Sequence, residues 1–201
     1  MKAGIVVLVV VLIIVLLLGG MFIGRRNEMV RKNETVKSAW SQMDVVLQRR
    51  ADLIPNLVET VKGFATQEQK VFGDIAAARS ALLSARSPQE SIAAHGRLDG
   101  ALGRLLAVVE NYPQLRSNEN FLRLQDELAG TENRIAVERR RYNETVQDYN
   151  TYIALFPNSI VAGMSGFARN DAYFSATPES REVPRVQFPG ATAQPAPAPA
   201  R

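Results

Sequence analysis

The sequence predicts an all-α fold, in which an N-terminal transmembrane helix is followed by an antiparallel four-helix bundle and a disordered C-terminal tail. Three observations lead to this prediction. An uninterrupted apolar run lies near the N-terminus, apolar residues recur at a 3-4 spacing through most of the remaining chain, and no alternating strand pattern of convincing length appears. The chain has 201 residues, which is enough for one compact domain of ordinary size.

The apolar run extends from Ile5 to Ile23 and is interrupted only by two adjacent glycines. As a helix it rises about 28 Å, close to the roughly 30 Å hydrocarbon core of a bilayer. A cleaved signal peptide is the alternative, but its apolar region is normally about 7–15 residues and precedes a small-x-small cleavage site. The run is instead followed by Arg25 and Arg26. We therefore expect residues 1–24 to be a permanent transmembrane anchor.

The residues that flank the anchor indicate its orientation and its contacts. Lys2 is the only charged side chain before the apolar run, whereas Arg25 and Arg26 begin a longer basic cluster after it. The positive-inside rule favours a cytoplasmic body, although the opposite insertion is common for short N-termini that contain Lys. In the cytoplasm, both arginines could contact anionic headgroups. Gly20 and Gly24 form a Gly-xxx-Gly spacing that either pairs two anchors or only loosens the helix at the membrane edge.

A heptad seam follows the anchor and is sustained over five repeats, which predicts a long helix in coiled-coil-like packing. The seam consists of Met29, Asn33, Val36, Trp40, Met43, Leu47, Arg50, Ile54, Leu57, Val61 and Phe64. Asn33 and Arg50 are its polar exceptions. Pro55 lies inside the run, but the register continues through it, which favours one kinked helix over a break. If the helix does break, Asp52 could cap the second piece.

Capping signals predict where the next two helices begin. Thr66 and Gln69 form a capping box that starts the second helix. The sequence Ser87–Glu90 starts the third, with Ser as the cap and Pro at the first helical position. Pro113 ends the third helix, whose seam consists of Ile92, His95, Leu98, Leu102, Leu105, Val109 and Tyr112. We expect His95, the single histidine, to be a packed imidazole.

The fourth helix begins at Ser117 or Asn118 and is closed by Pro157. Its apolar positions repeat strictly by seven, which again predicts coiled-coil-like packing. These positions are Phe121, Leu128, Ile135, Tyr142, Tyr149 and Phe156.

The expected helix lengths predict how the helices are arranged. The first helix (about 28–65) and the fourth (about 118–156) are each about 57 Å long, whereas the second and third are about 30 and 37 Å. The short pair therefore fits against the far half of the first helix, so that residues 25–157 form a bundle domain on a two-helix stalk. Trp40 and Tyr142 meet in the stalk, where leftover apolar surface is available to another subunit or partner.

Two further segments follow the bundle. Residues 158–188 begin with an apolar stretch, Ile160–Phe167, that the geometry places near the bilayer. This stretch either lies on the lipid surface or folds back on the end of the stalk. Residues 189–201 are rich in Pro and Ala and are predicted to be a disordered tail.

Composition excludes many kinds of reactive centre. The chain has no Cys and one His, which excludes thiolate metal sites, a Cys nucleophile and an HExxH motif. It contains no phosphate-binding loop, and a net charge of +4 from 24 basic and 20 acidic residues is not a nucleic-acid signature. We therefore predict that the protein is not an enzyme and has no catalytic residues, cofactor, metal or nucleic-acid partner.

Several blocks of this sequence resemble the LemA family, and together they cover about residues 20–188. The blocks are Val36–Val45, Arg49–Val58, Val108–Pro113 and, most extensively, Asn118–Asn150. The resemblance implies a bacterial protein with one N-terminal membrane helix and a helical body. It implies no established enzymatic activity and offers no catalytic residues, and relatives are linked to membrane-associated assemblies, including magnetosome formation.

Two functional hypotheses follow. The first is a scaffold or adaptor at the bacterial cytoplasmic membrane, whose partners are the lipid bilayer and either a membrane-associated protein or further copies of the chain. Its candidate interaction and anchoring residues are Gly20, Gly24, Arg25, Arg26, Trp40 and Tyr142. The alternative is a small-ligand or pH sensor, or an unrecognised enzyme. It requires polar groups such as Asn33, Arg50 and His95 to gather around one cavity.

Overall fold

A computed structural model describes residues 2–175 of the chain, and all regular secondary structure in this part is helical. This confirms the predicted all-α fold with a long apolar helix at the N-terminus. The predicted tail at residues 189–201 lies outside the described residues. The six helices are α1 (Lys2–Lys62), α2 (Gln69–Ser84), α3 (Pro88–Val109), α4 (Pro113–Arg116), α5 (Glu119–Ala154) and α6 (Asn158–Ser165).

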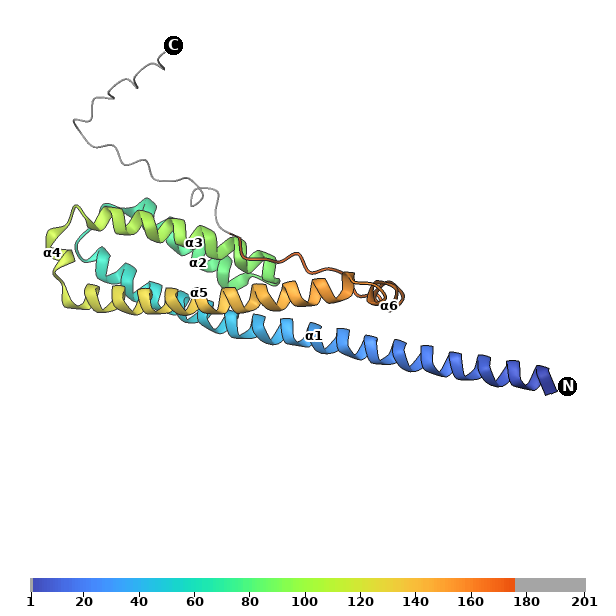
Figure 1. Cartoon of the computed structure of the whole chain (residues 1–201). Coiled ribbons are helices and arrows are strands. Elements are labelled where there is room, and N and C mark those ends of the chain that lie inside the picture. The colour runs from blue at the N-terminus through green and yellow to red at the C-terminus, as the bar shows by residue number, and fades with distance from the viewer. Residues whose placement is uncertain (1, 176–201) are drawn as a thin grey trace, which may run out of the picture.

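Helix α1 is one uninterrupted rod of 61 residues, about 90 Å long by its rise per residue (Figure 1). Its N-terminal part is apolar enough to cross a membrane, and none of that part is buried against the rest of the chain. The helix continues through Pro55, as the unbroken register predicted. Proline lacks the N–H that would bond to the carbonyl of Ala51, and Arg79 of α2 donates its Nε–H to that carbonyl instead, at 2.8 Å. The break at Pro55 with Asp52 as a cap does not occur.

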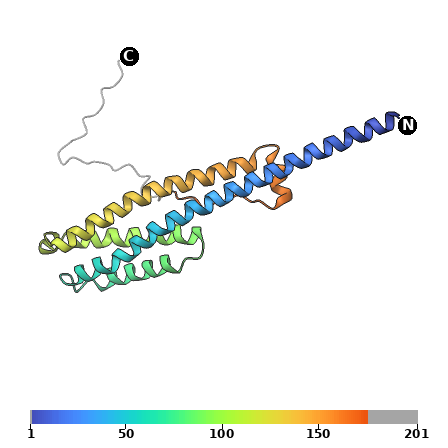
Figure 2. The same ribbon diagram turned by 90° about the horizontal axis from the view of Figure 1, so that it is seen from below.

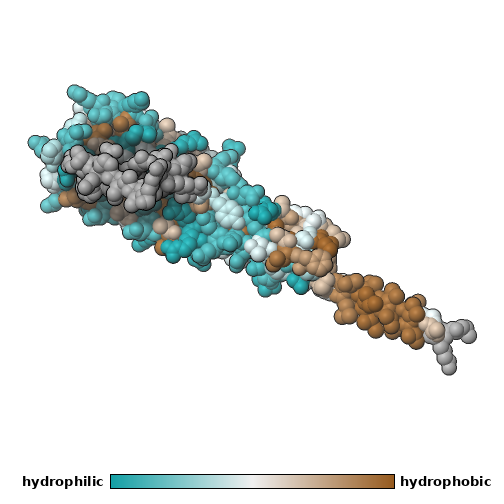
Figure 3. Space-filling view, turned by 45° about the horizontal axis from the view of Figure 1, so that its top comes forward, coloured by the Kyte–Doolittle hydropathy of each residue, from teal (hydrophilic) through white to brown (hydrophobic). Residues whose placement is uncertain are grey.

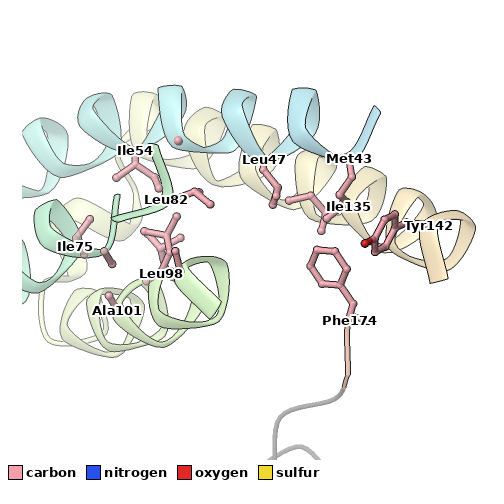
Figure 4. Close-up of a cluster of buried hydrophobic side chains, with 14 of the residues drawn as sticks. Met43, Leu47, Ile54, Ile75, Leu82, Leu98, Ala101, Ile135, Tyr142 and Phe174 are labelled. Carbon is pink, nitrogen blue, oxygen red and sulfur yellow. The ribbon is translucent and has the colours of Figure 1, made fainter. Parts of the chain in front are cut away.

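The second half of α1 packs beside α5, and α2 and α3 pair with each other against the far end of α1 (Figures 1 and 2). One hydrophobic core unites these four helices (Figure 4). Its fully buried members include Leu47 and Ile54 of α1, Ile75 of α2, Leu98 of α3 and Ile135 of α5. The heptad seams therefore form the interior of the body.

Two of the predicted helix starts are confirmed, and one is wrong. The Ser87 hydroxyl accepts from the Glu90 amide at 3.3 Å, and the Asn118 carboxamide accepts from the Phe121 amide at 3.1 Å. Thr66 does not cap α2, which begins at Gln69. The two amides that Thr66 would cap are already bonded to backbone carbonyls in the turns that follow α1.

The end of the predicted fourth helix also needs correction. Helix α5 stops at Ala154, so Phe156 lies outside the heptad seam and is 82% exposed. The one-turn helix α4, which starts at Pro113 and places Leu115 in the core, was not predicted either. A single turn contains too few residues for apolar periodicity to show it.

Helix α6 folds back against α1 and α5, which is one of the two placements considered for the segment after Pro157. Gly166 ends α6 with a φ of 77°, a left-handed conformation that turns the chain back and that glycine adopts without strain. Residues 167–175 then return along α5 toward the body (Figure 1). We call residues 167–175 the return segment.

Candidate functional site

Four of the six predicted interaction residues lie where the apolar part of α1 ends. Gly20 and Gly24 are exposed in the single chain, and a Cβ added to either would meet no neighbouring atom within 4 Å. Arg26 is exposed, whereas Arg25 is half-buried and donates from Nη1 to the Asn158 side-chain oxygen at 2.9 Å. Arg25 therefore ties α6 to the end of the apolar part of α1.

The other two predicted residues, Trp40 and Tyr142, are in contact, which confirms the register predicted for α1 and α5. Their ring centroids are 5.2 Å apart in an edge-on arrangement. Phe174 of the return segment completes this cluster. Its ring lies 6.3 Å from that of Trp40 and 6.1 Å from that of Tyr142, and Figure 4 shows it beside Tyr142. Tyr142 is completely buried, and burial raises the pKa of its hydroxyl above the ordinary value. The cluster also reaches α3, since the ring of His95 lies 6.4 Å from that of Phe174.

Two asparagines of α5 hold the return segment in place. Asn143 exchanges two hydrogen bonds with the backbone of Phe174, at 2.8 and 3.0 Å. Asn150 exchanges two with the backbone of Asn170, at 2.7 and 2.8 Å. Each carboxamide thus satisfies a backbone donor and an acceptor that have no helical partner. These asparagines were not among the predicted site residues, although a Tyr-Asn pair repeats seven residues apart in α5.

A second cluster surrounds Arg50, the charged residue in the seam of α1. Its side chain is buried, and its guanidinium contacts Asp99 of α3 at 2.8 Å and Glu132 of α5. His95 lies one helical turn before Asp99, with Nε2 3.4 Å from the carboxylate. A charge inside a helical core is stable only when it is paired, and these contacts join α1, α3 and α5 through one cation.

Burial and charge together set the protonation of the Arg50 cluster. Burial, reinforced by Arg50, lowers the pKa of His95 to about 4, so the imidazole is neutral at pH 7. Burial raises the pKa of Asp99, and the neighbouring Arg50 opposes that change. Ligand atoms of His95, Asp99 and Glu132 lie within 4.8 Å of one another, a set that could hold a metal ion. Here Arg50 already supplies positive charge to both carboxylates, and the arrangement fits an interhelical ion-pair network.

A cavity of about 220 Å³ lies beside this cluster. Arg50 and Glu132 form its polar side, and its remaining lining is largely apolar, from α1, α3 and α5. His95 does not line it, and Asn33 lies 17 residues before Arg50, about 25 Å away along α1. The three polar groups that the sensor hypothesis requires therefore do not gather around one cavity.

Comparison with known proteins identifies the relatives of this chain. The model of the LemA family matches residues 39–188, from the middle of α1 past the return segment. The magnetosome proteins MamQ 1 and MamQ 2 of Paramagnetospirillum magneticum are each 29% identical over 180 residues, which covers 77% of this chain and 66% of theirs. Protein LemA of Metamycoplasma hominis is 25% identical over 167 residues, covering 83% of this chain and 74% of the relative. The chain thus spans about two thirds of the MamQ proteins, and it belongs to the LemA family.

Proposed function

We propose that this protein is a membrane-anchored helical scaffold or adaptor, which acts through protein–protein contacts at the bacterial cytoplasmic membrane. One observation carries the proposal: α1 joins a fully exposed apolar stretch to the packed body without interruption. A rigid joint fixes the height and direction of the body relative to the membrane. Fixing position in this way is what a scaffold requires, and it needs no reactive group.

The proposal assigns a part to each region of the molecule. Residues 1–24 are the anchor, and residues 25–157 form the working body, whose far end is an antiparallel four-helix bundle. The stalk of α1 and α5 lies between the bundle and the membrane. Relatives named magnetosome proteins are consistent with the membrane-associated assemblies that the LemA resemblance implies.

A groove between α1 and α5 is the surface that best fits a protein partner. Val45 of α1 is 66% exposed and Val137 of α5 is 56% exposed, and both line a hollow of about 440 Å³. Arg134 and Glu138 lie beside these valines. An apolar centre with charged neighbours is the usual composition of a protein interface.

Crosslinking in native membranes, followed by affinity purification, tests the scaffold. We expect an oligomer or a stable partner to be recovered with the wild-type chain. Val45→Asp combined with Val137→Asp should lose it, because two charges would be buried in the contact. Asn56→Asp, which adds a charge at an exposed position of α1 outside the groove, is the matched control and should retain the partner. A strictly monomeric protein with no partner would contradict the proposal.

The side of the membrane is tested separately. The basic residues after the apolar run, led by Arg25 and Arg26, favour a cytoplasmic body. A reporter fused to the C-terminus and active only in the cytoplasm should therefore be active. Activity only of a reporter that requires the external compartment would reverse this assignment.

A small-ligand sensor is the weaker candidate. It is favoured by the cavity beside Arg50 and Glu132, whose largely apolar walls could accept a small molecule with one polar end. A ligand that raises the melting temperature of the wild-type protein but not of a Leu102→Trp variant, in which the cavity is filled, would support this function.

A further inference from the structure

The segment around α6 exposes more apolar side chain than a surface helix of a water-soluble body normally does. Phe156, Ile160 and Met164 are all more than half exposed, with Met164 at 74%. Val161 and Ala162, on the inner side, are buried. Residues 155–165 contain no charged side chain. We call residues 155–165 the collar.

Polar contacts fix the position of the collar along α1. Asn158 accepts from Arg25 at 2.9 Å and donates to the carbonyl of Tyr152 at 2.9 Å. Phe22, near the end of the apolar run of α1, packs against the core. The collar is therefore held at the level where the apolar part of the anchor ends.

The orientation of the short helix α6 differs from that of the long helices α1 and α5. Figure 1 shows α6 nearly end-on beside α1, and Figure 2 shows it running across α1. A helix that lies across a membrane-spanning helix lies along the plane of the membrane. Figure 3 shows apolar surface around the collar directly beside the apolar end of α1, with the hydrophilic surface of the body beyond it.

The groups next to the collar follow the order expected at a membrane surface. Beyond it on α1 come exposed basic residues, beginning with Arg26 and continuing with Arg31. Lys32 lies 5.4 Å above the ring of Tyr152. Apolar side chains followed by basic groups and a tyrosine is the composition found from the edge of the hydrocarbon to the headgroups.

We propose that the collar lies in the bilayer that α1 crosses, with its exposed apolar side chains at the boundary between headgroups and acyl chains. This inference rests on the proposed insertion of α1. The continuity of the collar with the apolar surface of the anchor identifies lipid as the occupant, because any surface at this level touches the bilayer first. An interfacial helix of this kind lies about 5–10 Å into the boundary region. Bound there, it sets the height of the body above the membrane.

Single-cysteine labelling tests the proposal, and the chain contains no native Cys. Leu12→Cys, Met164→Cys and Leu83→Cys full-length proteins carry an environment-sensitive fluorophore and are reconstituted in vesicles of phosphatidylcholine and phosphatidylglycerol. Quenching is measured with aqueous iodide and with lipids that carry a nitroxide at a shallow or a deep acyl position. Leu83 is the matched control, since it is exposed on α2 of the body and lies outside the groove between α1 and α5.

The label at Met164 should be quenched by the shallow nitroxide and be about fivefold less accessible to iodide than the label at Leu83. Equal iodide quenching at both positions would overturn the proposal. Protection from iodide without nitroxide quenching would also overturn it, because protein would then cover the collar. The label at Leu12 should be quenched by the deep nitroxide. If it is not, the proposed membrane anchoring is refuted. If the label at Leu12 is quenched by the deep nitroxide but the label at Met164 is fully accessible to iodide, only the proposed position of the collar in the bilayer is refuted.

Discussion

The two ends of this molecule are stabilised by different forces. At the far end, α2 and α3 cover α1, and side chains from four helices share one hydrophobic core. At the other end, which we propose to lie at the membrane and call the membrane end, α6 and the return segment rest on α1 and α5 through a small apolar contact and a few asparagine and arginine hydrogen bonds. The stability of the far end should therefore depend on the volume of the side chains buried in its core. The membrane end should depend on single polar contacts and on the bilayer.

The largest effect is expected where the two ends meet. Tyr142→Ala removes a completely buried ring from contact with Trp40 and Phe174 and should lower the free energy of unfolding by about 3–5 kcal/mol. Phe156→Ala, an equally large truncation at an exposed position, should change it by less than about 0.5 kcal/mol in detergent. Denaturant titration in micelles measures both. Similar losses for the two variants would remove the distinction between the ends.

A pH effect of similar size is expected from His95 in the core. Its pKa is about 4 in the folded protein, against an ordinary value of 6.5, so the unfolded chain binds a proton first as the pH falls. The contribution of His95 is complete above about pH 6.5, and about 3 kcal/mol of stability should be lost as the pH falls to 4.

The groups around His95 decide how this effect is isolated. Arg50, Glu132 and Arg139 act on it through their charges, and Asp99, whose own raised pKa has the opposite effect on stability in acid, contacts it directly. His95→Gln retains those groups, so the difference between its pH–stability curve and that of the wild type measures the histidine. Parallel curves between pH 7 and pH 4 would show that His95 is not buried in neutral form.

The next effect concerns the ion pairs of Arg50. Arg50→Met leaves Asp99 and Glu132 without their cation, but both carboxylates are partly exposed, which moderates the loss to about 1–3 kcal/mol. Arg134→Met, at an exposed position of α5, should be close to neutral. If the triple variant Arg50→Met, Asp99→Asn, Glu132→Gln is as unstable as Arg50→Met alone, the unpaired charges of the two carboxylates are not the cause of the lost stability.

The smallest effect is expected at the membrane end and should be local. Asn150→Ala removes both hydrogen bonds to the backbone of Asn170, each contributing about 0.5–1.5 kcal/mol. Amide exchange in the return segment should accelerate, while the amides of α2 and α3 remain protected. Asn133→Ala, at an exposed position of the same helix, is the control. Faster exchange throughout the body would mean that the return segment is part of the global folding unit.

What the sequence could predict depended on periodicity. The heptad seams of α1 and α5 identified most of the core and brought Trp40 to Tyr142, because a 3-4 spacing reports directly which side of a helix is buried. Phe174 could not be predicted in the same way, since side chain–backbone hydrogen bonds hold the return segment and leave no apolar period.

Local signals were less reliable than periodicity. Thr66 has the right neighbours for a capping box, but its target amides are bonded within the turn after α1. Arg50 stood out as polar in an apolar seam, but its partners come from two other helices, and spacing within one helix cannot identify them. Both cases depend on contacts that form only after the helices have packed.

The central claim is that α1 couples the anchor rigidly to the body, and one distance tests it. Spin labels at Leu18→Cys and Val45→Cys, both exposed on α1, are separated by 27 residues, or about 40 Å along an unbroken helix. Double electron–electron resonance on the protein in vesicles should give one narrow distance distribution centred near that value. A broad or shorter distribution would show a hinge near Gly20 and Gly24, and the body would then not be held in a fixed position above the membrane.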